Sequence, residues 1–252
     1  MQYFVNKQSI VREIWGKSDT ILFIFAGASA EFALNKAVDW LYFTGKLPKD
    51  PLGRLFSTVN YARQIVFSEM DAANAAIDKI AAIHTAVENS RGDKIPDWAY
   101  RDVLFMLIHY SISSFEVLER KLNLTEKEEV FYVFYRVGVR MGLKELPLTY
   151  SQWLSARDTH LQQDLINSDF TKDLYKQYKK HLGFYRYILL VEGQKMVVPQ
   201  RVVALLNFNK IHLLLPILWV YKIAKKVRID GLLKSAILPK GYKEEIKALD
   251  VV

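Results

Sequence analysis

Residues 50–89 constrain the fold more than any other part of the chain, because their pattern is that of two consecutive amphipathic helices. Asp50 is a suitable N-cap, and Pro51 suits the first helical position, where a backbone N–H is not needed. The second helix begins near residues 68–71. Its spacing places one stripe of side chains on a single face: Ile77, Ile80, Ala81, His84 and Val87.

The second helix also carries an unusual density of small side chains around that stripe: Ala72, Ala73, Ala75, Ala76, Ala81, Ala82 and Ala86. A helix with so few bulky side chains allows a flat, large group to approach its backbone, with the imidazole of His84 facing that group. Close helix packing favours small residues as well, and a lone histidine on an apolar face is more often a core residue than a ligand. Residue pattern alone therefore leaves both interpretations open.

The rest of the chain continues the helical pattern, and no strand-like alternation persists anywhere in it. An apolar helix is predicted over residues 20–30 and their continuation, and a longer one from about Asp97 to Asn123. Capping boxes are predicted at residues 125–128 and 149–152, the first opening a helix that ends near Gly142. A basic helix is predicted from Ser168 to His181 and Gly183. The prediction is an all-α protein, a single multi-helix, globin-like bundle domain spanning residues 1–252.

Several classes of site are excluded by residues that the sequence lacks. It has no cysteine, so disulfides, cysteine-ligated zinc, iron–sulfur clusters and thiolate-ligated haem are ruled out. Neither His-Glu-x-x-His nor Glu-x-x-His occurs, which argues against zincin and di-iron sites. The glycine-rich and nucleophile motifs of P-loop, Rossmann and α/β-hydrolase proteins are missing, as is the aspartate cluster of helical prenyl synthases.

The C-terminal part of the chain has an apolar segment followed by basic residues. Residues 202–221 have the length of a membrane span, but Asn207, Asn209, Lys210, His212 and Pro216 would be disruptive at mid-membrane. We therefore favour a buried helix pair kinked at Pro216. The alternative is an interfacial helix on an anionic bilayer, with Trp219 and Tyr221 near its surface and the basic run KIAKKVR behind them.

The net charge of the chain gives little information about its binding partners. The net charge is +8, and residues 222–252 hold eight Lys or Arg against four Asp or Glu. Basic and aromatic residues alternate in TKDLYKQYKKHLGFYRY, but this is as well explained by an exposed helix face, and no nucleic acid partner is expected. Residues 1–19 lack a secretory signal pattern. A cytoplasmic protein is expected, with peripheral membrane association as the alternative.

Four motifs occur in a fixed order along the chain: AGASAEFALNKAVDWL, DPLGRLFST, AAIHTAVEN and LTEKEEVFYVFYRVGVRMGLKELP. Together they resemble the MpaB-type oxygenase family, which includes the latex-clearing proteins, or rubber oxygenases. The resemblance is strongest over residues 10–160. It implies an all-α protein that binds haem b.

The resemblance also implies which residues hold the haem. An arginine and a threonine four residues later lie near the haem in the family, and a histidine about thirty residues on is the proximal iron ligand. These positions are Arg54, Thr58 and His84 here. Taken alone, Arg54 would rather form a salt bridge with Asp50, and Thr58 would be an ordinary helix-face residue. Rubber oxygenases can carry a lysine three residues after the arginine, where this chain has Ser57, so rubber is not the expected substrate.

Other histidines and acids are weaker candidates. His109 is the second choice for an iron ligand, with a core role as its alternative, and His160, His181 and His212 rank below it. Glu31 and Asp39 are the acids that could assist proton transfer, although each is more simply a structural or surface residue.

The predicted function is that of a haem b-dependent oxygenase that uses O₂ on a hydrophobic, isoprenoid- or lipid-like substrate. The alternative is a non-enzymatic helical protein that binds lipid or docks on a membrane without haem.

Overall fold

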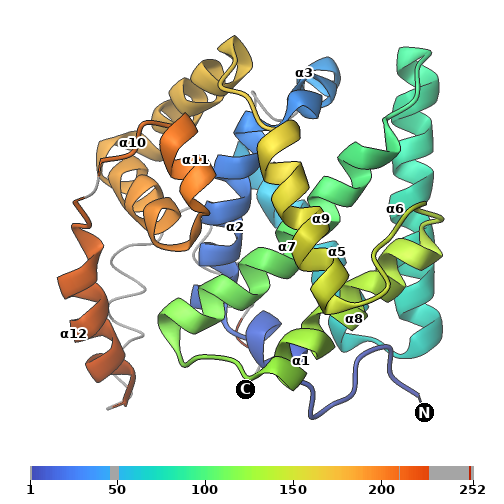
Figure 1. The fold of residues 1–252 in the computed structure, drawn as a ribbon, viewed down its shortest axis with the longest axis horizontal. Helices are drawn as coiled ribbons and strands as arrows, with labels where there is room; N and C mark the ends of the chain where they lie inside the picture. Colours follow the sequence, from blue (N-terminus) through green and yellow to red (C-terminus); the bar gives the residue numbers. More distant parts are fainter. Residues whose placement is uncertain (1, 46–50, 210, 227–249, 251–252) are drawn as a thin grey trace.

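The computed structural model describes residues 2–45, 51–209, 211–226 and 250, and these residues confirm the all-α prediction. The only β-type pairings among them are two isolated bridges, Tyr3 with Glu69 and Asn35 with Leu165. The predicted N-cap at Asp50 lies outside this part of the chain. Figure 1 shows the helices gathered into one bundle around α2, with α12 at its edge.

The helices have the following bounds: α1 Ile10–Trp15, α2 Ser18–Leu34, α3 Asp39–Thr44, α5 Pro51–Phe67, α6 Met70–Arg91, α7 Asp97–Leu118, α8 Leu124–Arg140, α9 Tyr150–Gln163, α10 Asp169–Val197, α11 Gln200–Leu205 and α12 Leu214–Lys226. A short 3₁₀ turn, Lys36–Val38, joins α2 to α3. Helix α5 starts at Pro51 as predicted, and α7 starts at Asp97 but ends at Leu118, earlier than expected.

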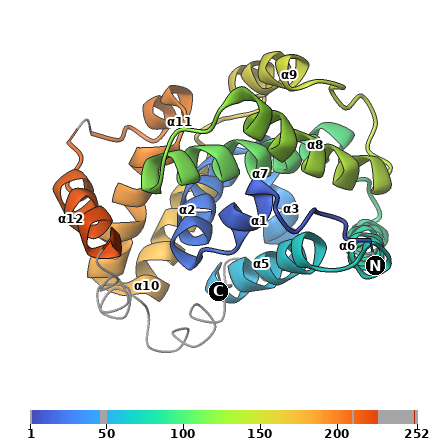
Figure 2. The same cartoon turned by 90° about the horizontal axis from the view of Figure 1, so that it is seen from below.

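Helix α2 is the central element, and it is buried because its residues are apolar on nearly all sides. It packs against α7 and α10 (Figure 2). Gly27 allows the close approach of α7, since a Cβ at that position would lie 2.2 Å from the Tyr110 ring. The core at this crossing includes the fully buried Trp15, whose indole N–H donates to Ser111 Oγ at 3.1 Å.

One of the two predicted capping boxes is misplaced. Helix α8 begins at Leu124, and its box is formed by Asn123 and Glu126, so the prediction at residues 125–128 is wrong. Asn123 has extended backbone angles and accepts from the N–H of Glu126, which makes it the N-cap. At α9 the predicted Thr149 is the N-cap and accepts from the N–H of Gln152. The Gln152 side chain accepts from the N–H of Leu148 instead of that of Thr149, so only half of the predicted box forms.

Helix α10 begins as predicted and ends later than predicted. Ser168 is its N-cap, but helical structure resumes after Gly183 and continues to Val197. Gly183 has φ 72°, a left-handed conformation that interrupts the helix and changes its direction. The glycine therefore marks a break inside α10 rather than its end, because the apolar residues after it have a buried face to occupy.

The predicted kink at Pro216 is also wrong. Helix α11 ends at Leu205, and the chain leaves the helix through Asn207, which has φ 52°. Helix α12 then starts at Leu214, so Pro216 lies in its first turn, where the missing N–H has no helical partner to lose. Among the helices that the structure describes, none is both long and apolar enough to cross a membrane.

Candidate functional site

A cavity with a volume of about 690 Å³ lies between α2, α5, α6, α7, α10 and α12. Its wall is mostly apolar, with side chains such as Phe25, Ile80, Leu107, Leu190 and Leu218. Cavities of roughly 300–1,000 Å³ with apolar walls and a few polar groups are typical of small-molecule sites. This cavity is therefore the candidate functional site.

Two of the three predicted haem-contacting residues line this cavity. His84, from α6, and Thr58, from α5, are both half-buried and both contribute to its wall. The His84 ring lies 5.1 Å from the ring of Tyr100, whose hydroxyl donates to Glu88 Oε1 at 3.0 Å. The side chain of Arg54 lies outside the described part of the structure, so its predicted role stays a prediction.

Two alanines of α6 have a different role from the one expected for an approaching flat group, whereas Ala72, Ala75, Ala82 and Ala86 are exposed. The α6 residues on the cavity wall, within the described chain, are Ile80, Ile83, His84 and Val87. Ala73 and Ala76 are instead buried in the main core. Close packing of α6 on its neighbours therefore explains these small side chains, while His84 reaches the cavity from the other part of the helix.

His109, the second choice for an iron ligand, is placed in the protein core and does not line the cavity. Burial is the main cause that lowers its pKa to about 4, the positive charge of Arg157 lowers it further, and a hydrogen bond with the backbone of Val197 opposes the shift. The ring is thus neutral at physiological pH, as expected of a core histidine.

The two candidate acids form ion pairs away from the cavity wall. Asp39 Oδ2 accepts from Arg91 at 2.7 Å, and the Arg91 guanidinium stacks 3.9 Å above the Trp40 ring. Glu31 is fully buried and accepts from both terminal nitrogens of Arg157 and from the Tyr110 hydroxyl. Burial alone would raise the pKa of Glu31, but Arg157 and then His160 lower it well below its usual range.

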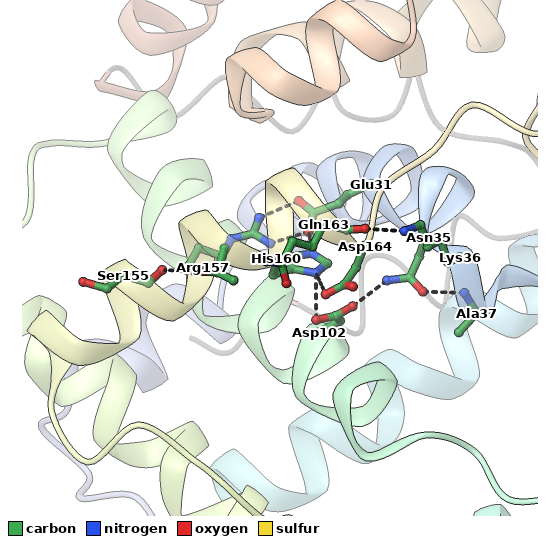
Figure 3. A network of polar contacts seen from close by, with 11 residues as sticks. Glu31, Asn35, Lys36, Ala37, Asp102, Ser155, Arg157, His160, Gln163 and Asp164 are labelled. Carbon is green, nitrogen blue, oxygen red and sulfur yellow. Dashed lines mark hydrogen bonds and ion pairs between the residues drawn. The ribbon is translucent and has the colours of Figure 1, made fainter.

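Glu31 belongs to a buried polar network that links α2, α7 and α9 (Figure 3). His160 lies at its centre, with Nε2 2.9 Å from Glu31 Oε1 and Nδ1 2.7 Å from Asp102 Oδ1. Asn35 donates to the other oxygen of Asp102 at 2.8 Å. Burial opposes protonation of His160, yet the hydrogen bonds to Asp102 and Glu31 raise its pKa to about 9.

The same network contains a group that could hold a cation. One ligand atom each from Asp102, His160 and Asp164 lie within 4.8 Å of one another. Because the raised pKa favours a protonated His160, the imidazolium itself supplies the positive charge between these carboxylates. Sequence analysis ranked His160 low and missed this network. The signal for it is the helical spacing of Arg157 and His160 on α9 and of Asp164, the C-cap of that helix, four residues later.

Further polar groups on the cavity wall were also not anticipated. Asp19 is the only carboxylate among the described lining residues, and it is buried. The hydroxyl of Tyr221, on α12, donates to Asp19 Oδ2 at 2.8 Å and so ties α12 to the start of α2. Arg186 and His181, both on α10, also contribute to the wall.

The residues present fit a haem group. The cavity is large and apolar, as a porphyrin requires, and its wall includes the imidazole of His84, the kind of side chain that most often ligates haem iron. Thr58 adds a hydroxyl on α5. Porphyrin propionates need donors of this kind.

The sequence profile described as "ER-bound oxygenase mpaB/B'/Rubber oxygenase, catalytic domain" matches residues 16–221. No curated protein and no solved structure matches the chain. The matched residues include α2, α5, α6, α7 and α10, and α12 as far as Tyr221, so they contain the whole described cavity wall.

Proposed function

Because the chain belongs to the ER-bound oxygenase mpaB/B'/rubber oxygenase family, we propose that it is a haem b-dependent oxygenase acting on a hydrophobic, isoprenoid- or lipid-like molecule with O₂. The observation that carries the proposal is the meeting of His84 and Thr58 on the wall of one large apolar cavity. These two residues come from the consecutive helices α5 and α6, and both face the site that a buried prosthetic group and substrate would need.

In this proposal His84 holds the iron through a ring nitrogen, and Thr58 and Arg54 hold the propionates. When bound, the haem supplies the iron centre that activates dioxygen. His109 is not given this role, because its ring lies in the core and outside the cavity wall.

The remaining wall of the cavity binds the substrate and keeps water away from it. Most of its side chains from α2, α7 and α10 are apolar, so they favour a hydrocarbon chain over a polar metabolite. The proposal gives Glu31 and Asp39 structural roles, because each pairs with an arginine away from this wall. Asp19 is the carboxylate placed to interact with a bound molecule, with Tyr221 donating to it.

A direct test is to produce the protein with haem supplied and to record its absorption spectrum. We expect a Soret band from the wild type, loss of most haem from His84→Ala, and retention by His109→Ala. The His109 variant is a matched control, since it removes the other apolar-face histidine. A Soret band of unchanged position and intensity in His84→Ala would exclude His84 as the essential ligand.

A second candidate function, lipid binding or membrane docking without haem, is favoured by the outer face of α12. Leu215, Trp219 and Val220 are 52%, 68% and 54% exposed, which is uncommon for large apolar side chains on one helix. Lys222 follows them in the sequence, and most of the basic residues after it lie outside the described chain. An amphipathic helix with aromatic and basic residues suits an anionic bilayer surface.

Liposome co-sedimentation tests this second function. We expect binding to vesicles containing phosphatidylserine that falls in Trp219→Ser and is weaker on neutral vesicles. Binding together with a Soret band would mean a membrane-associated oxygenase, whereas binding by a colourless protein that takes up no haem would favour the non-enzymatic function.

A further inference from the structure

An arginine for which the described residues provide no ion-pair partner lies on the wall of the apolar cavity. Arg186, on α10, is half-buried, and its Nε atom is buried with no hydrogen-bond partner in the described structure. No carboxylate of the described residues forms an ion pair with it. A guanidinium at an apolar wall is unfavourable unless water or an anion compensates its charge. An anion bound in the cavity would supply this compensation.

Arg186 lies close to a solvent-facing part of this wall. It follows the break at Gly183 by three residues, and the two residues between them, Phe184 and Tyr185, are 60% and 82% exposed. His181, which also contributes to the wall, is exposed. Further along the same helix, Leu189, Leu190 and Met196 line the cavity with apolar atoms. Along α10, the charged guanidinium of Arg186 is therefore followed by apolar side chains that line the cavity.

This order of groups suits an amphipathic ligand whose charged head stays near water while its tail is buried. The planar guanidinium forms two parallel hydrogen bonds with a carboxylate, which makes a carboxylate the best match for Arg186. The apolar wall beyond it matches an acyl or isoprenoid tail.

We propose that Arg186 anchors the carboxylate of an amphipathic acid, a fatty or isoprenoid acid, whose tail occupies the cavity. This deepens the proposed function by naming the substrate class, and it rests on that function only in taking the ligand as the substrate. The binding itself requires no haem.

Haem propionates are a second source of the same carboxylate chemistry. The experiment must therefore measure the two ligands separately. Dodecanoate is a suitable probe for the acid, dodecanol is the matched probe without a charge, and free haem is the third.

The test uses three full-length variants: Arg186→Gln, Arg186→Lys and Arg201→Gln. Arg201, on α11, is the matched control, because it too is half-buried with an Nε atom that lacks a hydrogen-bond partner in the described structure, yet it does not contribute to the described cavity wall. Binding of dodecanoate and dodecanol is measured by isothermal titration calorimetry on haem-free protein, and haem binding by Soret absorbance. Circular dichroism and thermal melting check that each variant is folded.

We expect dodecanoate affinity to fall about tenfold or more in Arg186→Gln, in line with the loss of a charge-assisted hydrogen bond. Partial recovery in Arg186→Lys, unchanged dodecanol affinity and no effect of Arg201→Gln would complete the expected pattern. Equal losses for dodecanoate and dodecanol, or no loss for either, would overturn the proposal. So would weaker haem binding by Arg186→Gln with dodecanoate unaffected, since Arg186 would then hold a propionate.

The two proposals can fail separately. If wild-type protein takes up no haem but shows the expected dodecanoate pattern, the oxygenase function fails and the carboxylate anchor stands. If haem binds through His84 and dodecanoate does not bind, the reverse is true.

Discussion

Removing the Arg157 guanidinium should destabilise the protein more than any change at an exposed ion pair. Arg157 and Glu31 are 4% and 0% exposed, and the arginine binds both carboxylate oxygens of Glu31. Arg157→Met keeps most of the side-chain volume but leaves the Glu31 charge with only Tyr110 and His160 as partners. Breaking a buried pair by removing one partner costs about 3–5 kcal/mol.

This loss is large compared with the total stability of a typical domain, roughly 5–15 kcal/mol. For a chain of this size each kcal/mol shifts Tm by about 2–4 °C, so Arg157→Met should lower Tm by roughly 6–20 °C. The assay is thermal and urea unfolding followed by circular dichroism. Arg120→Met is the matched control, because Arg120 forms an exposed bidentate pair with Glu126, which should be worth at most about 1 kcal/mol.

The same variant also tests whether the buried polar network affects ligand binding in the cavity. Arg157 is not a cavity-lining residue, so the folded variant should bind haem and dodecanoate as the wild type does. A loss below about 1 kcal/mol, comparable with that of Arg120→Met, would show that the network does not hold α2 and α9 together.

Three other perturbations have defined outcomes. The pKa of His160 is raised to about 9 from an ordinary 6.5, so the stability that its protonated ring contributes is complete below pH 6.5 and is lost as pH rises through 9. The urea midpoints of wild type and His160→Gln should therefore converge at high pH. A difference between the two midpoints that stays constant with pH would contradict the raised pKa of His160. Gly27→Ala should destabilise by about 1–3 kcal/mol, since its Cβ would meet the Tyr110 ring at 2.2 Å, and unchanged urea unfolding would disprove the close approach. Asn123→Ala should cost about 1 kcal/mol in the same assay through loss of the α8 cap, and an equal loss in Thr125→Ala would argue against the observed start of α8.

The cavity distinguishes the two histidines that were candidates for an iron ligand. On residue pattern alone His84 and His109 were similar, since both lie on apolar faces of predicted helices. The structure separates them, because α6 turns His84 toward the cavity while α7 places His109 against the backbone of Val197. Which face of a helix meets a cavity depends on its neighbours, and these are far away in the sequence.

Local signals determined the all-α architecture from the sequence by itself. Apolar spacing at three and four residues, Pro51 at a helix start, and the N-caps Thr149 and Ser168 act over one or two turns, so they can be recognised without neighbours. The ordered motifs were also sufficient to recognise the family, whose profile matches residues 16–221.

Only the tertiary structure decided which polar side chains pair with one another and which of them line the cavity. Glu31 and His160 are 129 positions apart, and their pairing depends on how α2 packs beside α9. The proposed role of Arg186 as a carboxylate anchor depends on its place on the cavity wall, three residues after the break at Gly183, and the sequence does not show this place. Burial, charge pairing and the shape of a cavity are set by long-range contacts, so no local pattern of residues contains them.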